Sequence, residues 1–474
     1  MKRRFLKITY CVLFLVISTA CAIAMPFYAS DGTRQKRSLA EFPQPIIGNR
    51  LNLSFPKAFE DWLKDHIAWR DELVTIRSRA LAGIQTSPDK QVIIGSDGWM
   101  YFQETLKDYT GESAFTQNDL YRVSAVMRGL NNALAKKGIP LIVAIAPNKS
   151  TVYPAYMPPG YPRRNGPGNA QRLQVLQGAQ FVDLTSLLTG QARQDRLLYH
   201  KTDTHWNHFG ARLSAHALLS TLAKVTKTSI DLPDLSDPGT VRRDWTGDLS
   251  QMIYPANTPR EEQYYYEDMG QEFSVKGRMR SLEDMSIITA GGKTDLNLLV
   301  LRDSFSNALI PYLSNAFSNV QYKRQMPLPF MDLVNVDAVV LEMVERRLPE
   351  LLTGAPVMMA ETCGAWDREG GTAKLTAYAH PTNDGVRVFG YAGSSADRIM
   401  ECSVSVTASG SSTFYDAFPI WETKLASQLG IAGENQDGAF SLLLQNIPVD
   451  AQIQVRFVGD NVLLTQPATV KWVP

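Results

Sequence analysis

The stretch Leu296-Asn-Leu-Leu-Val-Leu301-Arg302-Asp303-Ser304-Phe305 places an apolar strand directly before a serine that opens a predicted helix. A serine at such a junction can present its hydroxyl at the carboxyl edge of a sheet, beside helix N-terminal amides. The pattern therefore favours Ser304 as a nucleophile. The alternative is a helix N-cap, the commonest use of a serine before a helix.

A second motif, Asp203-Thr-His205-Trp206, supplies the groups that a serine nucleophile needs. Residues two apart point the same way in extended backbone, so the aspartate can reach the histidine. His205 would take the proton of Ser304, and Asp203 would orient the imidazole and stabilise its charged form. Asp203, His205 and Ser304 are thus predicted catalytic residues for acyl transfer.

Five further residues are candidates for binding substrate or stabilising an oxyanion. They flank the nucleophile, follow the buried strand Leu141–Ala146 or end a predicted hairpin, and loops after such strands often bind ligands. Each of them can equally be an ordinary turn or hydrogen-bonding residue. The candidates are Phe305 (through its backbone amide), Asn148, Lys149, Arg302 and Tyr101.

The histidine motif also permits a metal site. His200, Asp203, His205 and His208 lie close together in the sequence, and such clusters can bind zinc or another transition metal. No second cluster supplies further ligands, and Asn207-His208-Phe209-Gly210 is typical of a helix start. We therefore predict no metal and no other cofactor.

The pattern around these motifs predicts an α/β fold with a mostly parallel sheet. Apolar strands over 141–146, 181–182, 296–301 and 337–342 alternate with helices over 118–137, 170–177 and 207–222. A long helix over 54–80 and a hairpin over 92–102 precede them. After residue 360, short alternating segments predict an all-β sandwich.

Composition sets the limits of this prediction. The chain has 474 residues, which allows two or three domains, and its hydrophobic content of 44% is ordinary for a globular protein. A formal net charge of +1 gives no indication of nucleic-acid binding.

The N-terminus predicts export. Lys2, Arg3, Arg4 and Lys7 precede an apolar run over 8–28, and about 20 apolar residues can cross a bilayer as a helix. We expect residues 1–30 to be a signal anchor and 31–52 a linker, with the remainder in the periplasm. A cleaved signal peptide and a lipoprotein signal at Cys21 are the alternatives.

The C-terminal domain carries two cysteines and several tryptophans of interest. Cys363 and Cys402 are an even pair in an exported domain and predict one disulfide, with two buried free thiols as the alternative. Trp366, Trp421 and Trp472 could stack on sugar rings, although core packing is the commoner role of tryptophan.

These motifs resemble the alginate O-acetyltransferase family AlgX/AlgJ. The matching stretches are Lys201-Thr-Asp203-Thr-His205-Trp206-Asn-His-Phe-Gly210, the late Arg302-Asp303-Ser304 turn, Gly98-Trp-Met-Tyr-Phe102 and the segment from Pro147-Asn148-Lys149 to Tyr153-Pro154. In ordinary SGNH hydrolases the serine comes first, whereas here the Asp-x-His motif precedes it, an order characteristic of this family.

The resemblance implies an SGNH-hydrolase-like three-layer α/β/α domain over 53–355 and a carbohydrate-binding domain over 360–474. It also implies transfer of acetyl to hydroxyls of an exopolysaccharide, either alginate or an alginate-like polymer. A membrane-bound O-acyltransferase would supply the acetyl group. Two rival functions remain: a polysaccharide acetylesterase with the same triad, and a non-catalytic polysaccharide-binding scaffold in an export complex.

Overall fold

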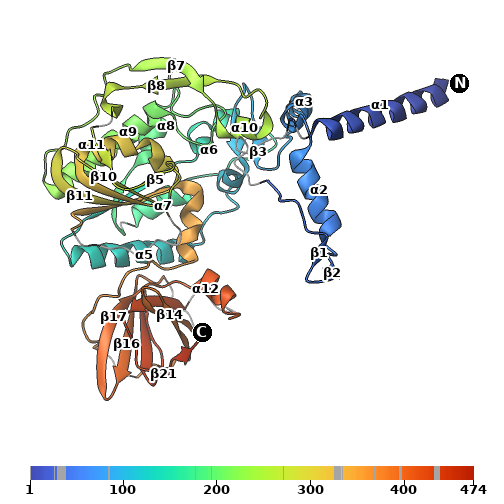
Figure 1. Cartoon of the computed structure of the whole chain (residues 1–474). Helices are drawn as coiled ribbons and strands as arrows, with labels where there is room; N and C mark the ends of the chain where they lie inside the picture. The colour runs from blue at the N-terminus through green and yellow to red at the C-terminus, as the bar shows by residue number, and fades with distance from the viewer. Residues whose placement is uncertain are drawn as a thin grey trace.

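The computed structural model describes residues 2–25, 27–28, 39–83, 86–176, 178–193, 195–270, 272–324, 333, 335–367, 370–393, 398–431 and 438–474. An α/β domain occupies the middle of the chain, and a β-rich domain follows it (Figure 1). Helices α1 (Lys2–Ala24), α2 (Phe55–His66) and α3 (Arg70–Ala82) extend to one side.

A seven-stranded sheet in the order β6-β5-β13-β11-β12-β10-β9 forms the centre of the α/β domain. The five strands from β6 to β12 are parallel, and β10 and β9 extend the sheet in antiparallel fashion. The strands are β5 (Leu141–Ala146), β6 (Gln180–Val182), β9 (Ser274–Val275), β10 (Ser286–Ala290), β11 (Thr294–Leu301), β12 (Phe317–Lys323) and β13 (Ala338–Val344).

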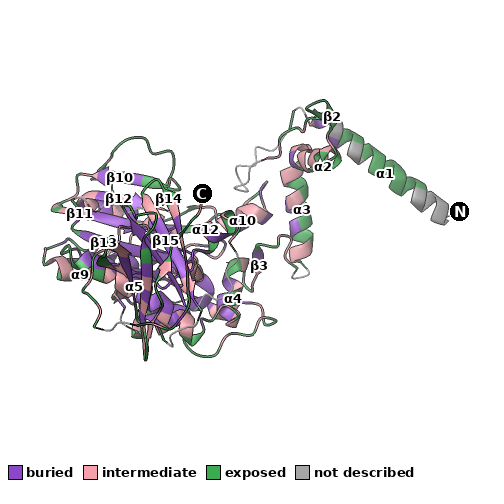
Figure 2. Cartoon of the chain, turned by 90° about the horizontal axis from the view of Figure 1, so that it is seen from below, coloured by how far each residue is buried: buried purple, intermediate pink, exposed green. Residues whose placement is uncertain are grey.

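Helices cover both faces of this sheet. Helices α8 (Leu184–Gln191), α9 (His208–Thr226) and α11 (Ile310–Ala316) share a core with Leu298 and Val300. Helices α5 (Gln117–Ala135) and α7 (Asn169–Val175) share another with Leu299 and Leu301. Alternate residues of β11 thus enter opposite cores, as the pleat requires. Buried residues follow the central strands (Figure 2), and the predicted α/β/α layering is confirmed.

The C-terminal domain is a sandwich of two sheets around one core, as predicted. One sheet contains β14 (Leu375–Thr382), β15 (Gly385–Ala392), β18 (Ala439–Leu444) and β22 (Lys471–Trp472). The other contains β16 (Glu401–Ala408), β17 (Ser411–Ala417), β19 (Gln452–Val458), β20 (Val462–Leu464) and β21 (Ala468–Thr469), and α12 (Thr423–Gln428) lies between β17 and β18 in the chain.

Helix α5 joins the two domains. Arg122 Nε donates to the carbonyl of Pro419 at 3.2 Å, and Lys136 Nζ lies 2.7 Å from a carboxylate oxygen of Asp416. The helix therefore contacts the sheet on one side and the sandwich on the other (Figure 1).

The predicted helix over 54–80 is wrong as a single element. It divides into α2 and α3 because Trp69, between them, adopts a left-handed backbone with φ 57°. The predicted hairpin is confirmed as β3 (Val92–Ile94) paired with β4 (Met100–Phe102). Strand β12 and helix α8 were not predicted from the sequence.

The predicted disulfide is absent, because Cys363 and Cys402 are both free thiols. Cys402 on β16 pairs with Ala417 of β17, while the amide of Cys363 donates to Phe414 from the other side of the same strand. Strand β17 thus lies between the two cysteine-bearing segments. The alternative prediction of free thiols fits this geometry, with Cys402 buried and Cys363 half-buried.

At the N-terminus, α1 exposes most of its described apolar side chains, among them Ile8 and Phe14. None of the helices within the described residues combines the length and apolarity needed to cross a membrane. The predicted linker falls partly on residues 31–38, which lie outside the described residues, and its second half forms a small hairpin of β1 (Ile46–Ile47) and β2 (Arg50–Leu51).

Candidate active site

Ser304 lies between the end of β11 and a short 3-10 helix, η5 (Phe305–Ala308). Ser304 occupies the N-cap position of η5, but its side chain makes no capping hydrogen bond. Asp303 satisfies this turn instead: its Oδ1 accepts from the Phe305 amide at 2.8 Å and its Oδ2 from the Val344 amide at 2.7 Å. The hydroxyl of Ser304 is thereby left available for His205.

His205 links Ser304 to Asp203. The imidazole Nε2 lies 2.8 Å from Ser304 Oγ, and Nδ1 lies 2.8 Å from Asp203 Oδ1. A carboxylate only accepts, so Nδ1 carries the proton and Nε2 accepts from the serine hydroxyl. The three candidate residues therefore form one hydrogen-bonded chain. Their catalytic roles stay a prediction.

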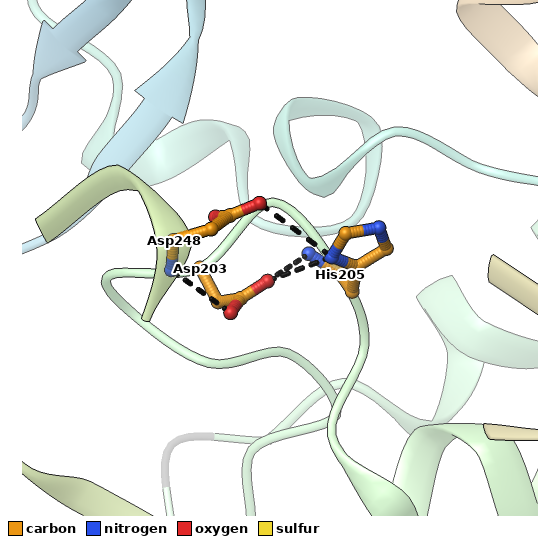
Figure 3. A group of neighbouring side chains, drawn as sticks. All are labelled: Asp203, His205 and Asp248. Atoms are coloured by element: carbon orange, nitrogen blue, oxygen red, sulfur yellow. Dashed lines mark hydrogen bonds and ion pairs between the residues drawn. The ribbon is translucent and has the colours of Figure 1, made fainter. Parts of the chain in front are cut away.

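The proximity of Asp203 and His205 arises differently from what we predicted. The segment is a tight bend before α9 rather than an extended strand. Asp203 Oδ1 accepts both the ring Nδ1–H and the backbone N–H of His205, the latter at 2.9 Å (Figure 3). A side chain that bonds to the amide two residues later is an Asx turn, which aspartate forms readily.

The second oxygen of Asp203 is held from another part of the chain. Oδ2 accepts from the Asp248 amide at 3.0 Å and from Trp245 Nε1 at 3.2 Å. Asp248 opens α10 (Asp248–Ile253), and Trp245 ends β7 (Thr240–Trp245). Burial alone would raise the pKa of Asp203, but its hydrogen bonds and the neighbouring His205 hold it far below the usual range. Asp203 is therefore a carboxylate at neutral pH.

A second carboxylate faces the same imidazole. Asp248 Oδ2 lies 3.8 Å from His205 Nδ1 (Figure 3), and Asp248 Oδ1 accepts from the Thr204 amide at 2.7 Å. Burial lowers the pKa of His205, but the hydrogen bond and charge of Asp203, together with the charge of Asp248, outweigh it and raise the pKa above its ordinary value. The histidine is thus a stronger base than a free imidazole.

We expect Asp248→Asn to shift the acid limb of kcat/KM to lower pH. His205 accepts a proton only when neutral, so activity rises as the pH passes upward through its pKa, and removing one negative charge lowers that pKa. The maximal rate should change little, and a pH profile of ester turnover measures the shift. An unshifted limb would contradict a role for Asp248 at the histidine.

Lys149 stabilises the loop that carries Asp203 and His205, which we call the histidine loop. Its buried Nζ donates to the carbonyl oxygens of His200 at 3.0 Å, Lys201 at 2.9 Å and Asp203 at 2.5 Å. Burial lowers the pKa of Lys149 to about 8, although the charges of Glu261, Asp203 and Asp248 oppose that effect. Lys149 was a candidate for binding substrate. In the structure, all three N–H donors of its ammonium group are used by the histidine loop, so its role here is structural.

We expect Lys149→Met to reduce the free energy of unfolding by about 2–4 kcal/mol, because three buried carbonyls lose their donor. Chemical denaturation measures the change. Lys201→Met is the matched control: that side chain is more exposed, and its Nζ lies 3.3 Å from the Asp97 carbonyl and 6.0 Å from the ring centre of Trp99, so an effect below about 0.5 kcal/mol is expected. Equal losses of stability in the two variants would show that Lys149 does not specifically stabilise the histidine loop.

The remaining candidates donate to neighbouring parts of the chain, although Asn148 Oδ1 and Arg302 Nε are buried without a hydrogen-bond partner among the described residues. Asn148 Nδ2 donates to Asp108 at 2.9 Å, and the hydroxyl of Tyr101 donates to the carbonyl of Tyr153 at 2.6 Å. Arg302 donates to Asn307 at 2.6 Å and to the carbonyl of Leu282 at 2.7 Å. The amide of Phe305, predicted to face an oxyanion, already donates to Asp303.

The residues of the alternative metal site are engaged elsewhere. His200 Nε2 lies 3.1 Å from Gln263 Nε2, and His208 Nδ1 lies 2.8 Å from the carbonyl of Tyr264. Burial lowers the pKa of His200 to about 3, so it stays neutral and accepts. Ligand atoms of Asp203, His205 and Asp248 do lie within 4.8 Å of one another, but both ring nitrogens of His205 have protein partners.

The three tryptophans of the C-terminal domain differ in exposure. Trp421 is 3% exposed and packs against Phe389, so it belongs to the core. Trp366 is half-buried and donates to Ser403 Oγ at 3.0 Å, and Trp472 is 37% exposed. Only Trp366 and Trp472 therefore keep the predicted option of stacking on a sugar.

Comparison with known proteins matches residues 92–281 to a family described as ALGX, an SGNH hydrolase-like domain of the acetyltransferase AlgX. The resemblance to the AlgX/AlgJ family is confirmed. The matched range contains Asp203 and His205 and ends before Ser304, so the assignment of the nucleophile depends on the hydrogen bond between Ser304 and His205.

Individual AlgX/AlgJ relatives are distant. A probable alginate O-acetylase AlgJ of Pseudomonas putida is 29% identical over 28% of this chain and 34% of its own length. The corresponding protein of Azotobacter vinelandii is 28% identical over 38% of this chain and 45% of its own. The chain thus spans less than half of either relative. The O-acetyltransferase domain of P. putida AlgJ aligns in structure over 54% of this chain and 92% of that domain, at 20% identity and a TM-score of 0.37.

Proposed function

We propose that this protein is an O-acetyltransferase that moves acetyl to hydroxyls of an exopolysaccharide through an acetyl-Ser304 intermediate. The observation that carries the proposal is the hydrogen-bonded chain from Asp203 through His205 to Ser304, with 2.8 Å at each side-chain contact of the imidazole. A buried carboxylate, an oriented imidazole and a hydroxyl in this order are what nucleophilic acyl transfer requires.

The reaction would occur in two half-reactions. Ser304 Oγ attacks the donor ester while its proton passes to His205 Nε2; the leaving alcohol then takes that proton, and acetyl-serine remains. In the second half, a sugar hydroxyl gives its proton to His205 and attacks the acetyl carbon, and Ser304 leaves with the proton that His205 returns. Asp203 stays ionised and stabilises the transient imidazolium.

The acceptor and the donor follow from the resemblance. Relatives described as alginate O-acetylases support alginate or an alginate-like polymer as the acceptor. We propose a membrane-bound O-acyltransferase as the donor protein. The basic segment before the apolar residues of α1 supports export to the periplasm, with α1 holding the protein at the inner membrane.

Water is the competing acceptor. The His205 side chain is 23% exposed, so solvent reaches the site, and this exposure favours a polysaccharide acetylesterase as the second candidate. The two functions share the acyl-enzyme and differ only in what attacks it.

Incubation with an activated acetyl ester and deacetylated polymannuronate oligosaccharides tests the proposal. New O-acetyl groups on the oligosaccharide, seen by mass spectrometry and dependent on Ser304, are the expected result. Release of acetate alone, together with removal of acetyl from acetylated polymer, would instead indicate an esterase. Polymer binding without turnover would indicate a scaffold.

A further inference from the structure

Arg346 lies at the same sheet edge as Ser304. It is the second residue of the 3-10 helix η6 (Glu345–Leu352), which follows β13 directly. Strand β13 is the parallel neighbour of β11, and the amide of Val344 donates to Asp303, the residue before the nucleophile. The backbone that carries Arg346 is thus fixed against the turn that carries Ser304.

The guanidinium of Arg346 packs on the aromatic ring that also supports His205. Its Cζ lies 5.7 Å from the ring centre of Phe305 and 5.4 Å from that of Phe102. The imidazole of His205 lies 5.0 Å from the same Phe305 ring. The ring of Phe305, the residue after the nucleophile, is therefore a shared neighbour of the Arg346 cation and the His205 imidazole.

One hydrogen-bond donor of this cation has no acceptor in the residues that the structure describes. The Arg346 side chain is 12% exposed, and its nearest carboxylate in the described part of the chain, Glu104, lies 3.9 Å from Nε on a side chain that is 70% exposed. Nη1 is buried and has no hydrogen-bond partner among the described residues. A buried N–H of a charged group without an acceptor is costly, so Nη1 is a candidate donor to a bound ligand.

The proposed reaction needs hydrogen-bond donors at this point. Attack by Ser304 places a negative charge on the former carbonyl oxygen, which must be stabilised by preorganised donors. The amide of Phe305 is not available for that role because it donates to Asp303. Arg346 Nη1, a buried donor without a partner in the described chain, is carried by the backbone next to the Ser304 turn and can serve in this role.

We propose that Arg346 Nη1 donates a hydrogen bond to the oxyanion of the tetrahedral intermediate. The carbonyl π pair moves onto that oxygen as the bond from Ser304 Oγ forms, and it returns when the C–O bond to the leaving alcohol breaks. Arg346 keeps its proton throughout. This inference rests on the proposed acetyl-serine chemistry.

The test is turnover of p-nitrophenyl acetate, which has no carboxylate and needs no polymer. Arg346→Gln should lower kcat by about 10²- to 10³-fold with little change in KM. Arg346→Lys, which keeps the charge but loses the planar fork, should recover part of the rate. Arg347→Gln is the control, because that guanidinium is paired with Glu350 at 2.8 Å, and it should behave as wild type.

Each outcome is decisive. An unreactive wild-type protein would overturn both the acetyl-serine chemistry and this inference. Full activity of Arg346→Gln would overturn the inference alone. Normal ester turnover combined with lost transfer to polymannuronate would show that Arg346 binds an acceptor carboxylate instead. If both Arg346 variants melted at a lower temperature and kcat did not fall selectively over KM, Arg346 would have a structural role.

Discussion

Replacing Ser304 by alanine is expected to abolish acetyl-ester turnover, with a loss of up to roughly 10⁶-fold in kcat. The substitution removes only the hydroxyl group, and His205 Nε2 contacts that group. Because the serine side chain makes no helix-capping bond, the free energy of unfolding should change by less than about 1 kcal/mol. Steady-state kinetics and thermal denaturation of the same samples measure both quantities.

Ser318→Ala is the matched control for this change. Ser318 is a half-buried serine on β12, and its hydroxyl lies 3.5 Å from Asn297 Oδ1 and accepts from Asn319 Nδ2 at 3.0 Å, far from His205 in the sequence and outside the triad. Its removal should leave activity and stability near wild type. A Ser304→Ala protein that retained most of its turnover would remove Ser304 from the chemistry.

Asp203→Asn is expected to have the second-largest effect, a fall of about 10⁴-fold in kcat. The carboxylate accepts from the backbone N–H and the ring Nδ1 of His205. It also accepts from Trp245 Nε1 and from the Asp248 amide. An asparagine has an acceptor on one side only, so its amide nitrogen meets a donor whichever way it turns. The imidazole then loses the tautomer in which Nε2 can accept the serine proton.

Asp248→Asn separates this effect from a general loss of negative charge. Both changes remove one charge near His205, but only Asp203 bonds to the ring nitrogen. A shifted pH profile with near-normal maximal rate for Asp248→Asn, beside a collapsed rate for Asp203→Asn, is the expected pair of results. Equal effects of both changes would mean that the specific hydrogen bond is unimportant.

The sequence was sufficient to predict the residues whose signal is local. The strand before Ser304 is apolar throughout its second half, and Asp203 and His205 are two residues apart, so pattern and spacing identified them. The layered α/β domain and the sandwich also followed from the change in hydrophobic period near residue 360.

The partners that position the site could not be predicted. Trp245 and Asp248 meet Asp203 only because β7 and α10 fold against the histidine loop, and nothing near them in the sequence indicates that contact. Arg346 meets Phe305 only because β13 pairs with β11. Contacts of this kind depend on strand order, which local periodicity does not determine.

The same limit explains the errors. The two cysteines were paired by count alone, whereas the register of β17 separates the segments that carry them. Lys149 and Asn148 were candidates for binding substrate or an oxyanion because they follow a buried strand, and in the structure Lys149 Nζ and Asn148 Nδ2 donate to other parts of the chain around the site. In both cases the residue types pointed to a possible role, but the sequence did not show which residues they contact in the fold.

The most direct measurement is the peptide mass of the protein after exposure to an activated acetyl ester. An acetyl group on the peptide containing Ser304, present in the wild type and absent in His205→Ala, is the predicted result. Folded wild-type protein that never carries acetyl on Ser304 under conditions that slow deacylation would contradict acyl transfer through this residue.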